Sequence, residues 1–348
     1  MTKKIVALAG DGIGPEIMAA GIAVLKVAAE KFELKIEISD FAFGGAGIDQ
    51  TGQPLPAETL VACQQADAIL LGAIGGPKWD EAPQRPEQGL LALRKALGLF
   101  ANLRPITVPP VLAALSPLKE ERVAGTDFIV VRELTGGIYF GEPRELSEEH
   151  AIDTCVYSAD EIRRIIRKAF EIAQTRRKKV TSVDKANVLA TSKLWRKVAE
   201  EVALEYPDVT LEHQLVDSAA MILIQQPTSF DVIVTENLFG DILSDEASVI
   251  PGSLGMLPSA SHSEVGPSLY EPIHGSAPDI AGKNIANPMS MILSVVMMLR
   301  QSFGWEEAAQ GIEAACDQVM NAGILTGDLG GTATTTEFVE AVMQKLTK

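Results

Sequence analysis

Apolar residues follow two alternating patterns along the chain. Short runs of consecutive apolar residues predict buried strands of a parallel sheet, and stretches with a period near 3.6 residues predict helices between them. The first strands and helices are expected at 4–10, Pro15 to about Lys31, 34–41, 56–65 and 68–73. Later ones are expected at 128–133, 159–175, 179–187 (a strand that ends in polar residues), 191–205, 210–216, 230–235, 289–303, 305–322 and from Thr335. This order predicts an α/β protein with a mostly parallel sheet flanked by helices.

The first strand feeds the segment Gly10-Asp-Gly-Ile-Gly-Pro-Glu16. Its glycines do not fit the dinucleotide fingerprint Gly-x-Gly-x-x-Gly, because position 15 is proline. Pro15 instead suits the first turn of the helix that follows. The sequence therefore argues against a Rossmann fold.

Two acidic residues follow the apolar run 230–235. Asp241 and Asp245 are four positions apart, so both carboxylates lie on one face near the start of a helix. A divalent cation such as Mg²⁺ or Mn²⁺ takes carboxylates at such a place together with waters and substrate oxygens. A solvated acidic first turn, favoured by the helix dipole, is the alternative.

Pro86 begins a helix with an unusual face. Glu87, Leu90, Leu91 and Arg94 lie at i, i+3, i+4 and i+7. Such a face suits a ligand that has an apolar branch and a carboxylate. Core leucines flanked by charges that reach solvent are the alternative.

Three arginines and two further polar residues stand at informative places. Arg104 and Arg132 are in extended segments, and together with Arg94 they offer forked donors to a di- or tricarboxylate. Lys185 and Asp217 lie just past predicted strand ends, where ligand sites of open parallel sheets gather.

A glycine-rich segment at 133–142 carries Tyr139 and is expected to form a hairpin with a returning strand at 154–157. A protruding hairpin often pairs with a second copy of the chain, so this one indicates a dimer. The segment 270–288 is expected to be a long loop, and loops of that length are usually functional. It offers backbone N–H groups at 275–277 and one acid, Asp279, that could accept from a ribose hydroxyl.

Composition excludes several classes. The chain has 348 residues, 30 Lys and Arg against 46 Asp and Glu, and a net charge of −16, which opposes general affinity for nucleic acid or anionic membranes. Three well-separated cysteines give no disulfide framework. No apolar stretch reaches membrane-span length and no leader pattern is visible, so we expect a cytoplasmic protein.

Three motifs, in this order, resemble the isocitrate and 3-isopropylmalate dehydrogenase family of decarboxylating β-hydroxyacid dehydrogenases, over essentially the whole chain. They are Gly10-Asp-Gly-Ile-Gly-Pro-Glu16, Asn237-Leu-Phe-Gly-Asp-Ile-Leu-Ser-Asp245 and Glu271-Pro-Ile-His-Gly-Ser-Ala-Pro-Asp-Ile-Ala-Gly282. The resemblance implies a two-lobed fold that is not Rossmann. Residues 1–99 and 252–348 are expected to form the NAD-binding domain. Residues 100–251 are expected to form the second domain, with a dimer-forming arm at about 134–157.

The resemblance also implies roles for the site residues. Tyr139, Lys185 and Asp217 are expected to be catalytic, with Lys185 and Asp217 entering the site of a partner in a homodimer. One Mg²⁺ or Mn²⁺ per site is expected on Asp217, Asp241 and Asp245. The substrate is expected to contact Glu87, Leu90, Leu91, Arg94, Arg104, Arg132 and Asp217. NAD is expected to contact Gly75, Gly76, Glu87, Glu271, His274, Gly275, Ser276, Ala277, Asp279, Ile280 and Asn287.

Within the family, the pair Leu90 and Leu91 resembles the enzymes in which leucines contact an isopropyl branch. Asp279 followed by Ile280 resembles the NAD-preferring pattern. The expected reaction is therefore NAD-dependent oxidative decarboxylation of (2R,3S)-3-isopropylmalate to 4-methyl-2-oxopentanoate and CO₂, a step of leucine biosynthesis. D-malate or tartrate as substrate is the closest alternative, and a Mg²⁺-dependent lyase is an alternative from another class.

Overall fold

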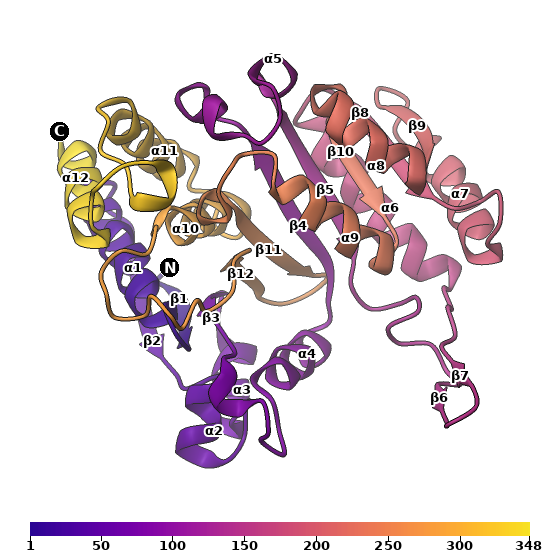
Figure 1. Ribbon diagram of the computed structural model, residues 1–348, viewed down its shortest axis with the longest axis horizontal. Helices are drawn as coiled ribbons and strands as arrows, with labels where there is room; N and C mark the ends of the chain where they lie inside the picture. Colours follow the sequence, from indigo (N-terminus) through magenta and orange to yellow (C-terminus); the bar gives the residue numbers. More distant parts are fainter. The chain divides into compact units, whose positions relative to one another are not determined.

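The computed structural model describes all residues from 1 to 348, and the chain forms two compact units (Figure 1). Unit 1 consists of Met1–Gly98 and Ser253–Lys348, so it contains both chain ends, and unit 2 consists of Leu99–Gly252. No helix is long and apolar enough to cross a membrane. The cytoplasmic location stays a prediction.

Unit 1 has five strands in the order β2-β1-β3-β12-β11. The strands are β1 (Lys3–Gly10), β2 (Ile36–Asp40), β3 (Ala68–Ala73), β11 (Pro258–Ser263) and β12 (Ser268–Pro272). All neighbouring pairs are parallel except β11 with β12. The helices are α1 (Gly14–Lys31), α2 (Gly45–Thr51), α3 (Ala57–Gln65), α4 (Pro86–Leu97), α10 (Met289–Gln301), α11 (Glu306–Asn321) and α12 (Thr335–Thr347).

The core of unit 1 lies where α1 and α10 pack against each other and against its strands. Nearly every residue of α10 up to Leu299 is buried, since α11, α1 and the sheet surround this helix. Buried apolar area of this kind supplies the main favourable term in folding, roughly 25 cal/mol per Å².

Unit 2 has five strands in the order β4-β5-β10-β8-β9. They are β4 (Leu99–Thr107), β5 (Asp127–Glu133), β10 (Val232–Thr235), β8 (Lys179–Asp184) and β9 (Thr210–Leu215). Only the β4–β5 pair is antiparallel. The helices are α5 (Glu120–Val123), α6 (Ala159–Gln174), α7 (Ala190–Ala203), α8 (Val216–Gln225) and α9 (Asn237–Ser248).

The central strands of unit 2 are buried on both faces, because α6 and α9 both pack on β5 and β10. The predicted mostly parallel sheet flanked by helices is thereby confirmed. The four parallel strands direct their carboxyl ends to one edge, and α7, α8 and α9 all begin there.

Two predicted elements are corrected. The expected strand at 154–157 is wrong: the arm's small hairpin pairs β6 (Glu145–Leu146) with β7 (Ala151–Ile152), and Val156 makes only an isolated bridge to Gly137. The loop expected from 270 begins only after Pro272, because 268–272 is strand β12. The hairpin β11–β12 lacks the β-branched residues that mark strands, and proline and serine dominate β11 instead.

Candidate active site

The acidic pair of α9 lies against two arginines of unit 2. Arg132, at the carboxyl end of β5, donates from Nη1 to Asp241 Oδ1. Arg104, on β4, donates from Nη1 to Asp245 Oδ1 at 2.6 Å and to Ser244 Oγ at 2.9 Å. Each carboxylate therefore has its own cation, which offsets the repulsion expected between like charges four residues apart.

These contacts bear on the two interpretations of the acidic pair. The side chain of Asp241 is partly exposed and that of Asp245 is 69% exposed. The carboxylates are thus organised by arginines and still accessible, whereas a merely solvated acidic turn would have no such partners. Hard oxygen donors of this kind suit Mg²⁺ or Mn²⁺. No group of three or more His, Cys, Asp or Glu side chains in the chain could hold a metal ion.

Tyr139 joins this cluster from the arm. Its hydroxyl donates to Asp241 Oδ2 at 2.8 Å. Burial raises the pKa of Tyr139, and the hydrogen bond to the Asp241 carboxylate raises it further. The phenol therefore keeps its proton near neutral pH and is a proton donor in form.

Lys185 and Asp217 form a second cluster at the same edge of the sheet. Lys185 follows β8 directly, Asp217 is in the first turn of α8, and Nζ donates to Asp217 Oδ1 at 2.6 Å. The pKa of Asp217 is lowered, chiefly by this hydrogen bond from Lys185. Within one chain the pair lies beyond β10, on the β8–β9 side of the sheet.

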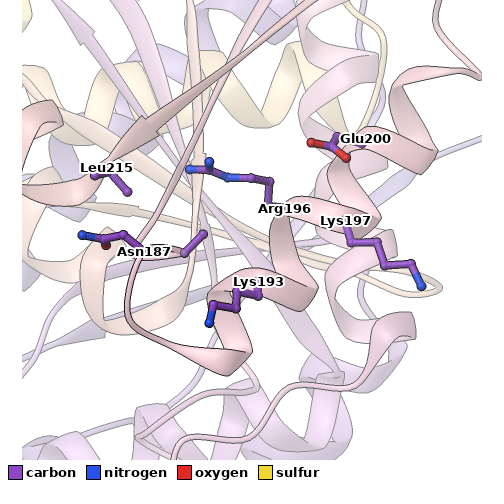
Figure 2. Close-up of a pocket in the computed structure, with 7 residues that line it drawn as sticks. Asn187, Lys193, Arg196, Lys197, Glu200 and Leu215 are labelled. Carbon is purple, nitrogen blue, oxygen red and sulfur yellow. The ribbon is translucent and has the colours of Figure 1, made fainter.

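A pocket of about 440 Å³ lies between the segment after β8 and α7, and no sequence pattern predicted it (Figure 2). Its cations come from successive turns of α7. Arg196 is held by two hydrogen bonds to the buried Asp184, at 3.0 and 2.9 Å. The lining residues are Ala186, Asn187, Lys193, Arg196, Lys197, Glu200 and Leu215.

In unit 1, α4 divides into two faces. Gly89, Leu93 and Leu97 are buried, whereas Leu91 is 54% exposed. Leu90 is half-buried. Core packing therefore does not account for Leu91. The helix α4 has an accessible apolar face, as binding of a ligand with an apolar branch requires.

Two charged residues accompany that leucine face. Arg94 donates from Nη2 to Glu271 Oε1 at 3.0 Å, and its Nε is buried without a hydrogen-bond partner. Glu87 is exposed. Its Oε1 lies close to Gly75, because a Cβ atom on residue 75 would be only 2.5 Å from that oxygen. The α4 face is thus joined to the glycine segment that was predicted to bind NAD.

A buried carboxylate that sequence reasoning missed organises that glycine segment. Asp11 accepts backbone N–H groups from Gly45, Ala46 and Gly75 at 2.8, 2.8 and 2.9 Å. Burial raises the pKa of Asp11, although the three N–H groups oppose this shift. The available signal was an acid flanked by glycines, and Gly10 and Gly12 do have positive φ values of 73° and 57°.

The loop after β12 meets the same place. Ser276 donates from Oγ to the Gly75 carbonyl at 2.8 Å, and its backbone carbonyl accepts from the Ile13 N–H at 2.8 Å. A Cβ at Gly12 would lie 2.0 Å from the Ser276 carbonyl oxygen. The structure therefore brings together the first motif, the Gly75 segment and the His274–Ala277 segment.

The other predicted NAD contacts differ in whether their polar atoms already have hydrogen-bond partners within the protein. His274 Nδ1 lies 2.9 Å from the Gly275 carbonyl, and its Nε2 is buried without a partner. Burial lowers the pKa of His274, so the ring is neutral and Nε2 is an acceptor in need of a donor. Asp279 is exposed. Asn287 is already engaged, since its Nδ2 donates to Asp328 at 2.9 Å and its Oδ1 accepts from the Met289 N–H at 3.0 Å.

Comparisons place the chain among known proteins. Residues 4–342 match the family described as isocitrate/isopropylmalate dehydrogenase. The proteins named 3-isopropylmalate dehydrogenase from Listeria monocytogenes and Streptococcus thermophilus are each 69% identical over 346 residues, covering 99% of this chain and 99% and 100% of theirs. The crystal structure of isocitrate dehydrogenase from Methylococcus capsulatus has a TM-score of 0.87 and 35% identity, with both chains covered fully.

The chain belongs to the isocitrate/isopropylmalate dehydrogenase family. The family resemblance and the fold class predicted from its three motifs are confirmed.

Proposed function

We propose that this chain is an NAD-dependent dehydrogenase that oxidatively decarboxylates 3-isopropylmalate to 4-methyl-2-oxopentanoate and CO₂, within leucine biosynthesis. The observation that carries the proposal is the exposed leucine face of α4, in a chain 69% identical to proteins named for this activity. Leu90 and Leu91 would contact the isopropyl branch. A hydroxyl or carboxylate in place of that branch would leave this apolar face without a partner.

The substrate's carboxylates call for forked cationic donors. Arg104 and Arg132 are held in fixed orientations by acceptors of their own, Asn102 for the first and Asn237 for the second. A preorganised guanidinium loses little freedom when it binds a carboxylate. Arg94, at the end of the α4 face, would bind the carboxylate nearest the branch.

The residues present fit a divalent cation. Asp241 and Asp245 supply two accessible carboxylates on one face of α9, and Asp217 of a second chain would supply the third ligand, since one chain gathers no set of three. When bound, Mg²⁺ or Mn²⁺ would acidify the substrate hydroxyl and stabilise the negative charge that develops on its oxygen.

The chain's own groups would move the protons. Lys185 Nζ, after losing its own ammonium proton, would accept the proton of the substrate hydroxyl, with Asp217 holding the amine in place through the 2.6 Å contact. As the carboxylate leaves as CO₂, Tyr139 would donate its phenolic proton to the carbon that carried this carboxylate. The raised pKa of Tyr139 supports this assignment, because the group is still protonated at neutral pH.

Unit 1 would bind NAD, which when bound would supply the hydride acceptor for the oxidation. The fit rests on the unpartnered Nε2 of His274 and on the positive-φ glycines of the Gly75–Gly76 segment, where the backbone can approach a ligand closely. The exposed carboxylate of Asp279 would accept ribose hydroxyls and repel a 2′-phosphate. The other predicted contacts in this unit keep the roles given above.

Unit 2 would form a homodimer. Its helices α8 and α9 expose Met221, Ile224 and Ile242, and the arm exposes Leu146. Large apolar side chains grouped on packed helices are typical of protein–protein interfaces. Dimer formation would bring Lys185 and Asp217 of one chain to the α9 carboxylates of the other.

The decisive experiment measures NADH formation with 3-isopropylmalate, D-malate, tartrate and isocitrate in the presence of NAD⁺ and Mg²⁺. We expect turnover that strongly favours 3-isopropylmalate and stops when EDTA removes the cation. Preference for D-malate or tartrate would contradict the role of the leucine face. Absence of NADH from all four substrates would contradict the dehydrogenase assignment and favour the lyase alternative.

A further inference from the structure

Asn237, the first residue of α9, connects three separate segments of unit 2. The residue is 1% exposed. Its side chain contacts Arg132 on β5 and Gly136 near the start of the arm, and its backbone contacts Tyr157, the last residue of the arm. A buried amide with every polar atom engaged fixes the relative positions of its partners.

The contact with Arg132 is twofold. Asn237 Oδ1 accepts from Arg132 Nε at 3.1 Å and from Nη2 at 3.0 Å. This sets one edge of the guanidinium toward Asn237 and directs Nη1 toward Asp241. Gly240 of the same helix leaves room for the arginine, because a Cβ there would lie 2.6 Å from Arg132 Cγ.

The remaining bonds of Asn237 reach the arm. Its Nδ2 donates to the Gly136 carbonyl at 3.2 Å, three residues before Tyr139. Its backbone N–H donates to the Tyr157 hydroxyl at 2.9 Å. The side chain thus ties the guanidinium to Gly136, whereas the backbone bond ties the start of α9 to Tyr157 without contacting the guanidinium.

We propose that Asn237 is a positioning residue that sets the orientation of the Arg132 guanidinium for substrate binding. The inference rests on the proposed function, since it assigns Arg132 to a substrate carboxylate. Asn237, Asp241 and Asp245 follow at i, i+4 and i+8, so one stripe of α9 runs from this buried amide to the exposed carboxylates. The stripe aligns the anion-binding arginine with the acidic pair.

Removal of the amide has a definite consequence. In Asn237→Ala the Arg132 Nε–H and Nη2–H groups lose the acceptor that they share, so the guanidinium loses the twofold contact that sets its orientation. A guanidinium that is no longer preorganised binds a carboxylate less tightly, because it loses more freedom on binding. We expect the KM for 3-isopropylmalate to rise about 10- to 100-fold, with NADH affinity unchanged because the predicted NAD contacts are in unit 1.

Tyr157→Phe is the matched control, because it removes a bond to the same residue and leaves the contact with Arg132 intact. We expect Tyr157→Phe to lower the melting temperature and to leave the KM within about twofold of wild type. An equal rise in KM in both variants would show a merely structural role and overturn the proposal. An unchanged KM in Asn237→Ala would do the same.

A second readout does not depend on turnover. In protein with ¹⁵N-labelled arginine, the Nε–H resonance of Arg132, assigned by its absence in Arg132→Lys, should be present in wild type and Tyr157→Phe. It should shift or vanish in Asn237→Ala. Asn237→Asp keeps an oxygen acceptor and should retain the resonance. This variant therefore tests the proposal if the alanine variant fails to fold. Loss of the resonance in Asn237→Asp would contradict the proposal. Failure of wild type to oxidise 3-isopropylmalate would instead refute the proposed function and leave the resonance test standing.

Discussion

At the residue scale, the three aspartates of unit 2 that are predicted to bind the metal ion each have a cationic partner. Asp241 and Asp245 contact arginines, and Asp217 contacts Lys185. Glu236 differs, because it is buried at the start of α9, where its carboxylate accepts a hydrogen bond from the Ser192 hydroxyl. Burial raises the pKa of Glu236 to about 7, and the neighbouring Asp184 carboxylate adds to the shift.

We expect Glu236→Gln to stabilise the protein in a pH-dependent way. The folded-state pKa of about 7 exceeds the ordinary value of 4.5, so the folded state binds the proton more tightly. The ionised carboxylate therefore opposes folding increasingly as pH rises from about 4.5 to 7. Urea unfolding at several pH values should show the variant near wild type below about pH 4.5 and more stable by up to about 3 kcal/mol above pH 7. A pH-independent difference would contradict the assignment.

Leu91→Ala tests the leucine face one side chain at a time. Loss of the apolar contact should lower kcat/KM for 3-isopropylmalate by about 10- to 100-fold, because such a pocket contact contributes about 1–3 kcal/mol. Activity on D-malate, which has no branch, should not fall. Steady-state assays with both substrates give the ratio of kcat/KM for 3-isopropylmalate to kcat/KM for D-malate in each variant. The control Leu204→Ala removes a leucine that is more exposed but lies at the end of α7, and it should change neither activity.

At the scale of elements, loops at strand ends are held by a few buried groups. In unit 1, Asp11 and Ser276 join the segment after β1, the segment after β3 and the loop after β12. In unit 2, Asn237 joins β5, the arm and α9. The regular elements supply the scaffold, and these polar side chains fix the loops that carry the chemistry.

Asp11→Ala should weaken NADH binding. Three backbone N–H groups lose their acceptor, so the Gly75 segment is released and unfolding becomes easier by several kcal/mol, at about 1–3 kcal/mol for each unsatisfied group. NADH fluorescence titration should show at least a tenfold rise in Kd, by the same reasoning.

Asp67→Ala is the control for this prediction. Asp67 also accepts a backbone N–H, that of Lys4 at 2.7 Å, but it is exposed and distant from the Gly75 segment along β3. Its loss should leave the Kd for NADH unchanged. Unaltered affinity in Asp11→Ala would show that the Gly75 segment does not need this brace for cofactor binding.

At the scale of the whole molecule, one chain does not gather every predicted site residue. Lys185 and Asp217 contact each other on the β8–β9 side of unit 2, and no three acidic side chains converge on a metal position. A site shared between two chains accounts for both facts. An isologous dimer would repeat the exchange, so that each chain completes the other's site.

Mixed dimers test the shared site. Lys185→Ala and Asp241→Ala should each be inactive as homodimers. When both chains are produced together, half of the dimers are mixed, and each mixed dimer has one intact site of two. The mixture should therefore recover about a quarter of wild-type activity. A second mixture, of Lys185→Ala with Asp217→Ala, should recover no activity, because both residues are donated by the same chain. Recovery in the first mixture only would establish the exchange. No recovery in the first mixture would contradict it.

The sequence by itself determined the fold class, the strands and helices of strong periodicity and the family. Apolar runs such as 68–73 and 230–235 are local signals, because a fully buried strand needs apolar side chains on both faces. The motif from Asn237 to Asp245 likewise placed two carboxylates on one helical face, which follows from helix geometry alone.

Only the tertiary structure decided which groups meet. The pairing of Arg132 with Asp241, the three backbone donors to Asp11 and the exposure of Leu91 depend on segments far apart in the chain. The hairpin β11–β12 and the arm's short strands were also missed or misplaced, since their burial and pairing come from neighbours rather than from their own composition. Distances between such side chains are set by how the sheets and helices pack, and no local pattern records that packing.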